Sequence, residues 1–209
     1  FKTILDRKLS RNTCEFFSTF ESDNHYHFPY CDNQGNVVAY KKRQVDDKKY
    51  SISGNWRDGK MFGQHLFSAG QSVLTICEGE WDAMSTWQML GGVSTYPVIS
   101  VRNGAGSALN DCKNNFEYID SFDTIVVCFD MDPQGREASQ QVAELFGSKV
   151  KVFKNNGSIK DASDYLQNSR GEAFVKEWWN AERFVPDGIV DGSTLWDIVS
   201  APMEDSLIN

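Results

Sequence analysis

Apolar and β-branched residues recur in short blocks along the second two-thirds of the chain. The blocks lie at residues 72–77, 96–101, 124–129 and 150–153. Residues 81–90 and 133–146 carry apolar side chains at helical spacing, and the first of these stretches stops at Gly91-Gly92, as helices often do. Continuous apolar strands that alternate with helices are typical of a parallel sheet covered on both faces. We therefore expect an α/β fold built around such a sheet.

The first third of the chain has a different pattern, with short strands and loops. Residues 25–30 and 36–43 flank a turn at Asp32-Asn33-Gln34-Gly35, which predicts a hairpin. A third strand is expected at residues 50–54, and Ser10 is placed to cap a short helix that reaches Phe17.

These patterns divide the chain into three expected segments. Residues 1–69 form a smaller α+β N-terminal subdomain, and residues 70–168 form the parallel-sheet domain. Residues 169–209 begin with a helix over 172–180 and continue as a looser stretch from Pro186.

Composition narrows the range of functions. Apolar residues make up 40% of the 209 residues and charged residues 24%, so the chain can bury a core. The net charge of −8 argues against a general nucleic-acid coat protein, but this charge is unevenly spread. Residues 1–70 carry a net charge of +3 and residues 71–209 a net charge of −11. This division suggests a site with phosphate on one wall and a metal ion on the other.

Other features bear on the compartment. No apolar run approaches the roughly 20 residues of a membrane span, so we expect no membrane partner. The five cysteines are scattered without a C-x-x-C pair, which argues against a zinc ribbon in this segment and favours a reducing compartment such as the cytoplasm. The chain starts without a signal peptide or an initiator Met, so we expect it to be a fragment.

Acidic residues follow the ends of the expected strands. Glu78 directly follows one, Asp130 and Asp132 follow another, and Asp161 lies just past a third. Ligands of open α/β sheets bind at the carboxyl ends of the strands, so these carboxylates are expected to converge. Their repulsion is offset if they bind a hard divalent cation, and the absence of His and Cys among them favours Mg²⁺ or Mn²⁺ over zinc.

The same acids have a simpler explanation. An Asp or Glu after a strand often only caps the next helix or favours its positive end. This alternative applies most to Glu80 and Asp82, and least to the four strand-end acids taken together.

Two further features point to phosphate. Lys41 and Arg43 share one face of an expected strand, which suits a triphosphate or a nucleic-acid backbone, although lysines there also block pairing at a sheet edge. Residues 102–107, which include Arg102 and Gly104, form a glycine-containing loop before an expected helix, where backbone N–H groups can approach an anion. Taken alone, this loop is better explained as a plain turn.

Taken together, these motifs resemble a known family. Glu78-Gly79-Glu80-Trp81-Asp82, followed by Asp130-Met131-Asp132 and Gly135-Arg136, is similar to the TOPRIM domain shared by primases and topoisomerases. The closer resemblance is to the primase domain of podophage-type primase–helicases, within the DnaG-type primase superfamily. The motifs that carry it are Lys41-x-Arg43, Phe62-Gly63-Gln64-His65-Leu66, Lys160-Asp161-Ala162-Ser163-Asp164 and Val185-Pro186-Asp187-Gly188-Ile189-Val190.

The resemblance implies a DNA primase core, a DNA-directed RNA polymerase that makes short RNA primers on single-stranded DNA from ribonucleoside triphosphates. It implies Glu78, Asp130 and Asp132 as catalytic metal ligands with Asp161 as a supporting acid. Lys41, Arg43 and Lys48 would contact nucleotide phosphates, with Lys41 and Lys48 in catalytic roles. The family's helicase and zinc-binding module would be linked or associated partners absent from this chain. A phage origin would place the protein in the host-cell cytoplasm.

Two other functions stay open on the sequence alone. A TOPRIM nuclease would use the same acids to cut DNA. A non-catalytic arm would bind single strands and serve a replicative helicase.

Overall fold

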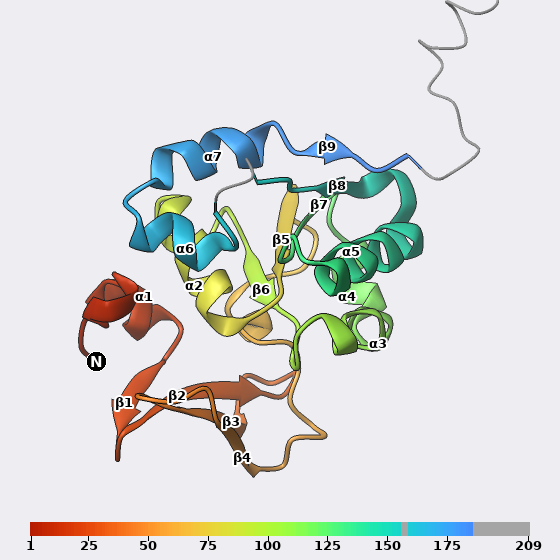
Figure 1. The fold of residues 1–209 in the computed structure, drawn as a ribbon. Helices are drawn as coiled ribbons and strands as arrows, with labels where there is room; N and C mark the ends of the chain where they lie inside the picture. Colours follow the sequence, from red (N-terminus) through yellow and green to blue (C-terminus); the bar gives the residue numbers. More distant parts are fainter. Residues whose placement is uncertain (156–158, 186–209) are drawn as a thin grey trace, which may run out of the picture.

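The chain folds around two separate sheets (Figure 1). The computed structural model describes residues 1–155 and 159–185. The N-terminal sheet is antiparallel, and its strands pair in sequence order. They are β1 (Phe20–Ser22), β2 (His25–Cys31), β3 (Val37–Gln44) and β4 (Tyr50–Gly54). The short helix α1 (Arg11–Phe16) precedes them, and the Ser10 side chain caps it by accepting the Thr13 N–H.

The second sheet has five strands in the order β6-β5-β7-β8-β9. Its members are β5 (Val73–Cys77), β6 (Val98–Ser100), β7 (Thr124–Cys128), β8 (Val150–Val152) and β9 (Glu182–Arg183). The first four of these are parallel, and β9 joins β8 in the antiparallel direction. The expected parallel sheet is confirmed, with the correction that one edge is closed by a short antiparallel strand.

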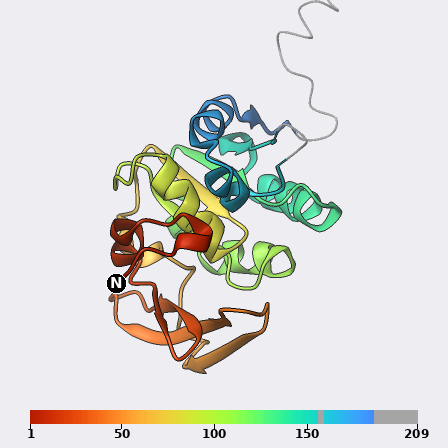
Figure 2. The same cartoon turned by 60° about the vertical axis from the view of Figure 1, so that its left-hand side comes forward.

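Helices cover both faces of this sheet (Figures 1 and 2). One face carries α2 (Glu80–Met89), α6 (Ala162–Gln167) and α7 (Gly171–Trp179), and the other carries α3 (Ala108–Asn114), α4 (Phe116–Asp120) and α5 (Pro133–Phe146). No described helix is long and apolar enough to cross a bilayer.

The local sequence explains where the main helices begin. Helix α5 has the expected bounds because Asp132 caps it and Pro133 fits its first turn. Helices α2 and α7 each lie one residue earlier than expected. The looser stretch expected from Pro186 lies outside the described residues.

The two sheets share one hydrophobic core. Alternate side chains of β2 point toward the second sheet, and there the rings of Tyr26 and Phe28 pack edge-on against Trp81, at centroid distances of 5.0 and 4.7 Å. Tyr30 packs on Phe62 in the connection between the sheets. This packing fixes the inner face of the N-terminal sheet against the start of α2, where the site lies.

Candidate active site

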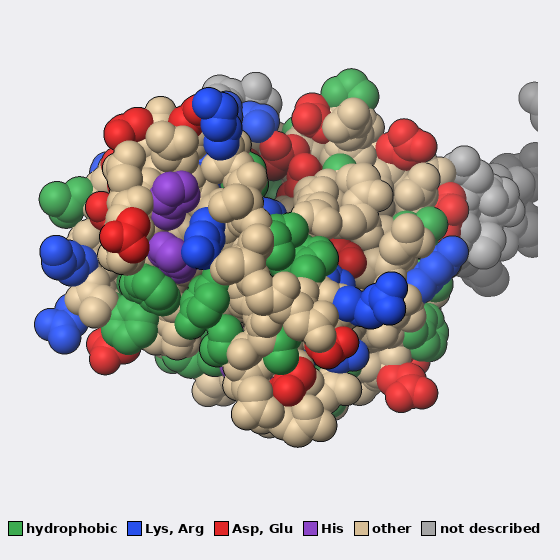
Figure 3. Space-filling view, turned by 90° about the horizontal axis from the view of Figure 1, so that it is seen from below, with side chains coloured by type: hydrophobic (Ala, Val, Ile, Leu, Met, Phe, Trp, Pro, Cys, Tyr) green, Lys and Arg blue, Asp and Glu red, His purple; other side chains and the backbone are tan. Residues whose placement is uncertain are grey.

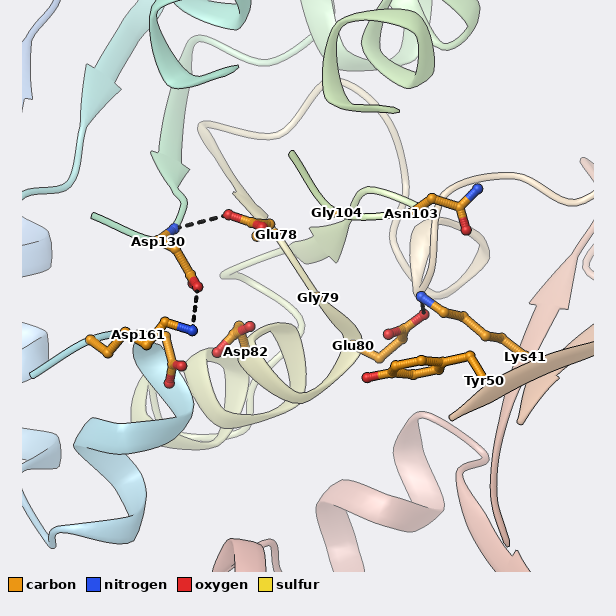
Figure 4. A pocket seen from close by; sticks show the side chains of 11 residues that line it. Lys41, Tyr50, Glu78, Gly79, Glu80, Asp82, Asn103, Gly104, Asp130 and Asp161 are labelled. Carbon is orange, nitrogen blue, oxygen red and sulfur yellow. Dashed lines mark hydrogen bonds and ion pairs between the residues drawn. The ribbon is translucent and has the colours of Figure 1, made fainter. Parts of the chain in front are cut away.

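An open cavity of about 440 Å³ lies at the carboxyl ends of β5 and β7, facing the N-terminal sheet (Figure 4). Its lining comprises Lys41, Tyr50, Glu78, Gly79, Glu80, Asp82, Asn103, Gly104, Asp130, Lys160 and Asp161. Acids gather on one side of the cavity, and Lys41 enters from the other.

Glu78 joins two loops at the cavity floor. Its Oε2 accepts the Asp130 N–H at 3.2 Å, and its Oε1 accepts the Ala105 N–H at 3.3 Å. Burial raises the pKa of Glu78, repulsion from Asp130 and Asp132 raises it further, and the two N–H donors oppose this shift. The predicted approach of Glu78 to Asp130 is therefore present in the structure.

Asp130 follows β7, and its Oδ2 lies 3.0 Å from the Lys160 Nζ. The backbone of Gly135, in the first turn of α5, lies against the Asp130 backbone so closely that a Cβ at this position would collide with the Asp130 carbonyl. A glycine is thus required to let the helix approach the strand end that carries Asp130.

Asp82 and Asp161 complete the acidic side. Asp82 lies in the first turn of α2 and accepts the Ser163 N–H at 3.1 Å, while Asp161 caps α6 by accepting the Asp164 N–H at 2.8 Å. Burial raises the pKa of Asp82 well above its usual value, and repulsion from Asp161 and Asp130 adds to this effect. Burial also raises the pKa of Asp161, and its neighbouring carboxylates add to the shift.

The acidic side has the chemistry of a cation site. Four carboxylates from three segments surround one space, and mutual repulsion contributes to the raised pKa values of Glu78, Asp82 and Asp161. Oxygen donors crowded in this way fit a hard divalent cation such as Mg²⁺ or Mn²⁺. Within residues 1–155 and 159–185, no three acidic, His or Cys side chains are already arranged as a metal-binding group.

The opposite wall is built around Lys41. Its Nζ lies 2.8 Å from the Glu80 Oε1 and donates to the Arg102 carbonyl at 2.9 Å. The Tyr30 hydroxyl donates to the same Glu80 oxygen at 2.5 Å, and burial together with the Glu80 charge raises the pKa of Tyr30 well above its usual value. Glu80 therefore ties β2 and β3 to α2 and holds Lys41 at the cavity (Figure 4). The Tyr50 ring packs against the Lys41 ammonium, with 5.0 Å between Nζ and the ring centroid.

Three of the other predicted residues lie away from the cavity lining. Asp132 is exposed and caps α5, accepting the Gly135 N–H at 2.8 Å. Lys48 is exposed in the turn between β3 and β4. The Arg102 guanidinium lies over the Trp56 ring, 4.4 Å from its centroid, and donates to the Trp56 carbonyl.

Two further predicted residues are close to the site. Gly104 lines the cavity with a left-handed backbone, at φ 67°. Arg43 follows Lys41 on the inner face of β3 and is 7% exposed. Its Nε has no hydrogen-bond partner among the described residues. Its position agrees with the shared face expected for Lys41 and Arg43.

Four charged or aromatic lining residues had received no site role in the sequence interpretation: Tyr50, Glu80, Asp82 and Lys160. Asp82 had one signal, since it follows Glu78 by one helical turn. Glu80 gave none, because its partners Lys41 and Tyr30 are distant in the chain. Tyr50 was expected only as the first residue of a strand, and its contact with Lys41 on the neighbouring strand was not foreseen. Lys160 was noted in the sequence only as the first residue of the motif Lys160-Asp161-Ala162-Ser163-Asp164, which carries the resemblance to phage primase domains.

The surface around the N-terminal sheet is mixed in charge. Viewed from below (Figure 3), Lys and Arg side chains are dispersed among acidic ones rather than gathered in one stripe. Lys41 is the basic residue through which the N-terminal segment, residues 1–70, contributes positive charge to the cavity lining.

The fold and the cavity together define a class: a Toprim-type domain whose acidic strand ends face a small antiparallel sheet. Residues 75–166 match the family model described as Toprim-like. The chain is 31% identical over 208 residues to the DNA helicase/primase of Enterobacteria phage T3, a match that covers 97% of this chain and 36% of that relative. It therefore spans about a third of that relative's length.

Two solved structures from bacteriophage T7 match most of the chain. One is the primase fragment of the T7 primase–helicase, with 30% identity, a TM-score of 0.77, and coverage of 85% of this chain and 74% of that chain. The other is the T7 lagging-strand DNA polymerase interacting with primase domains bound to an RNA/DNA hybrid and dTTP. A chain in it matches with 30% identity, a TM-score of 0.78, and coverage of 88% and 93%. The present chain belongs to the family of primase domains of bacteriophage primase–helicases.

Proposed function

We propose that this chain is the RNA-polymerising core of a DNA primase, which joins ribonucleotides on single-stranded DNA by metal-dependent nucleotidyl transfer. The observation that carries the proposal is the cavity itself, in which four carboxylates face a partly buried, anchored lysine. Acids suit a divalent cation and a lysine suits a triphosphate, so the two walls together match a nucleotide bound with its metal. The T7 primase domains bound to an RNA/DNA hybrid and dTTP support this assignment by similarity.

Glu78, Asp82, Asp130 and Asp161 are the residues that would hold Mg²⁺ or Mn²⁺. The bound cation would neutralise charge on the attacked phosphate and favour deprotonation of the primer 3′-hydroxyl. Asp132 is adjacent in sequence and adds negative charge from outside the cavity, since its charge contributes to the raised pKa of Glu78.

The protein's own contribution is mainly positioning. Lys41 is held at a fixed place by Glu80 and the Arg102 carbonyl, so its charge is already oriented when a triphosphate enters. Arg43 and Lys48 would contact phosphates further along β3 and its turn. Gly104 keeps backbone close to Glu78, and the Arg102 carbonyl helps to orient Lys41.

The wider assembly follows from the family. We propose single-stranded DNA as the template, ribonucleoside triphosphates as substrates, and a helicase and a zinc-binding module as linked or associated partners. The phage relatives support an intracellular site of action in the host cytoplasm.

The test is extension of a short RNA annealed to single-stranded DNA, with labelled ribonucleotides and Mg²⁺. Wild type should extend the RNA, and Asp130→Asn should lose at least a hundredfold in rate. Asp123→Asn is the matched control, because Asp123 is an exposed acid at the opposite end of the same strand. Equal rates for wild type and Asp130→Asn would refute the proposal. Magnesium-dependent cutting of DNA without nucleotides would instead identify a nuclease.

A further inference from the structure

Lys160 holds the position at Asp130 where a cation would bind. Its Nζ lies 3.0 Å from the Asp130 Oδ2, and both residues line the cavity. The Lys160 side chain is 63% exposed whereas that of Asp130 is 14% exposed, so a solvent-accessible ammonium reaches in from the rim to a largely buried carboxylate. Lys160 immediately precedes Asp161, the cap of α6, so its backbone is anchored beside the acids.

The charge balance of the cavity gives this contact its significance. Lys41 and Lys160 are the two cations among the lining residues. Lys41 is paired with Glu80, whereas Lys160 meets the acidic side through Asp130. An ammonium and a divalent cation repel one another strongly at this range, so the two cannot share the inner face of Asp130 without cost.

We propose that Lys160 is a tethered counter-ion for the metal-binding acids. It occupies Asp130 when no divalent cation is present and leaves that oxygen when the cation binds. Metal binding then exchanges one cation for another. The metal binds more weakly, because the ion pair between Lys160 and Asp130 must be broken first. This inference rests on the proposed function for the location of the metal, and adds the residue that sets how tightly the metal is held.

The inference is tested by titrating the purified chain with Mn²⁺ and following free Mn²⁺ by electron paramagnetic resonance, without nucleotide or DNA. Lys160→Met removes the charge and keeps the length of the side chain. We expect it to bind Mn²⁺ about five- to tenfold more tightly than wild type, which is roughly 1 to 1.4 kcal/mol. The matched control is Lys154→Met, because Lys154 is an exposed lysine whose ion pair with Glu182 lies outside this cavity. Its Mn²⁺ affinity should stay within twofold of wild type.

A second arm tests whether the effect passes through Asp130. In an Asp130→Asn background the ammonium loses the carboxylate that it contacts directly, so adding Lys160→Met should change Mn²⁺ affinity less than twofold. Thermal unfolding in EDTA gives a separate readout: Lys160→Met should unfold at a lower temperature than wild type, because an acid has lost its counter-ion. Mn²⁺ should then raise its melting temperature by more than it raises that of wild type.

The possible failures are distinguishable. If wild type binds Mn²⁺ and Lys160→Met binds it equally or more weakly, the counter-ion role is wrong while the proposed function stands. If wild type binds no Mn²⁺ at millimolar concentration and extends no RNA, both fail together.

Discussion

Replacing Asp82 by Asn should make the metal-free protein more stable. Asp82 reaches the crowded acidic side, where burial and the charges of Asp161 and Asp130 raise its pKa well above the usual value of 3.8. An amide of nearly the same shape removes one of four like charges. Its oxygen can still accept the Ser163 N–H that the carboxylate accepts at 3.1 Å.

The size of this effect follows from linkage. For each unit by which folding raises a carboxyl pKa, the ionised form is destabilised by about 1.4 kcal/mol relative to the protonated form. Part of the gain from removing the charge is offset, because a hydrogen bond to a neutral amide is weaker than one to a carboxylate by about 0.5–1 kcal/mol. We expect a net gain of about 1–2 kcal/mol at pH 7, or roughly 2–8 °C in melting temperature for a chain of this size.

The sign of the pH dependence adds a check. Because the folded-state pKa of Asp82 is raised, the folded protein binds its proton more tightly than the unfolded chain does. Wild type therefore loses stability as pH rises above about 3.8 toward the folded pKa. Below that window the acid is protonated in both states, so the advantage of Asp82→Asn should disappear near pH 3.5, if the fold persists there.

The assay is thermal unfolding in EDTA at several pH values, repeated with Mg²⁺. Magnesium should raise the melting temperature of wild type, by about 1.4 kcal/mol at ten times its dissociation constant, and should raise that of Asp82→Asn much less. If Asp82→Asn melts at or below the wild-type temperature in EDTA at pH 7, the charge of Asp82 does not destabilise the metal-free protein. A difference between the two proteins that does not change with pH would lead to the same conclusion.

Three further substitutions test other contacts. Glu80→Gln breaks the ion pair between Lys41 and the Glu80 side chain, which is 4% exposed. The free energy of unfolding in urea should fall by about 2–4 kcal/mol. A loss below about 0.5 kcal/mol would show that the pair does not stabilise the fold. Gly135→Ala forces a methyl group into the Asp130 backbone and should cost about 1–3 kcal/mol, with slower RNA extension, whereas wild-type stability would contradict the close approach. Asp132→Asn keeps an N-cap for α5, so the free energy of unfolding should stay within about 0.5 kcal/mol of wild type. RNA extension should slow less than in Asp130→Asn. If both variants lose the same extension rate, Asp132 is a metal ligand like Asp130.

The strand-end acids were predictable because two simple rules agree. Apolar runs locate the strands of a parallel sheet, and the carboxyl ends of such strands meet at one edge, so the approach of Glu78 to Asp130 follows from the order of segments alone. The same patterns locate α5 at its observed bounds, since Asp132 and Pro133 form a strong helix start.

Other features depend on tertiary contacts that periodicity does not encode. Strand β9 is two polar, exposed residues that become a strand only because the edge of β8 is available. The pair between Lys41 and Glu80 joins residues 39 positions apart on different layers, whereas the sequence had indicated only a phosphate contact for Lys41. Asp132 was expected to converge with Glu78 and Asp130, but Pro133 starts a helix that Asp132 caps.

The proposed metal site places a divalent cation on Asp130 and its acidic neighbours, opposite Lys41. It is tested most directly by an anomalous difference map from crystals of this chain grown or soaked with Mn²⁺. We expect one strong peak in the cavity, about 2.0–2.3 Å from an oxygen of Asp130 and from an oxygen of Glu78, Asp82 or Asp161. A fully occupied Mn²⁺ elsewhere, with this cavity free of anomalous signal, would contradict it.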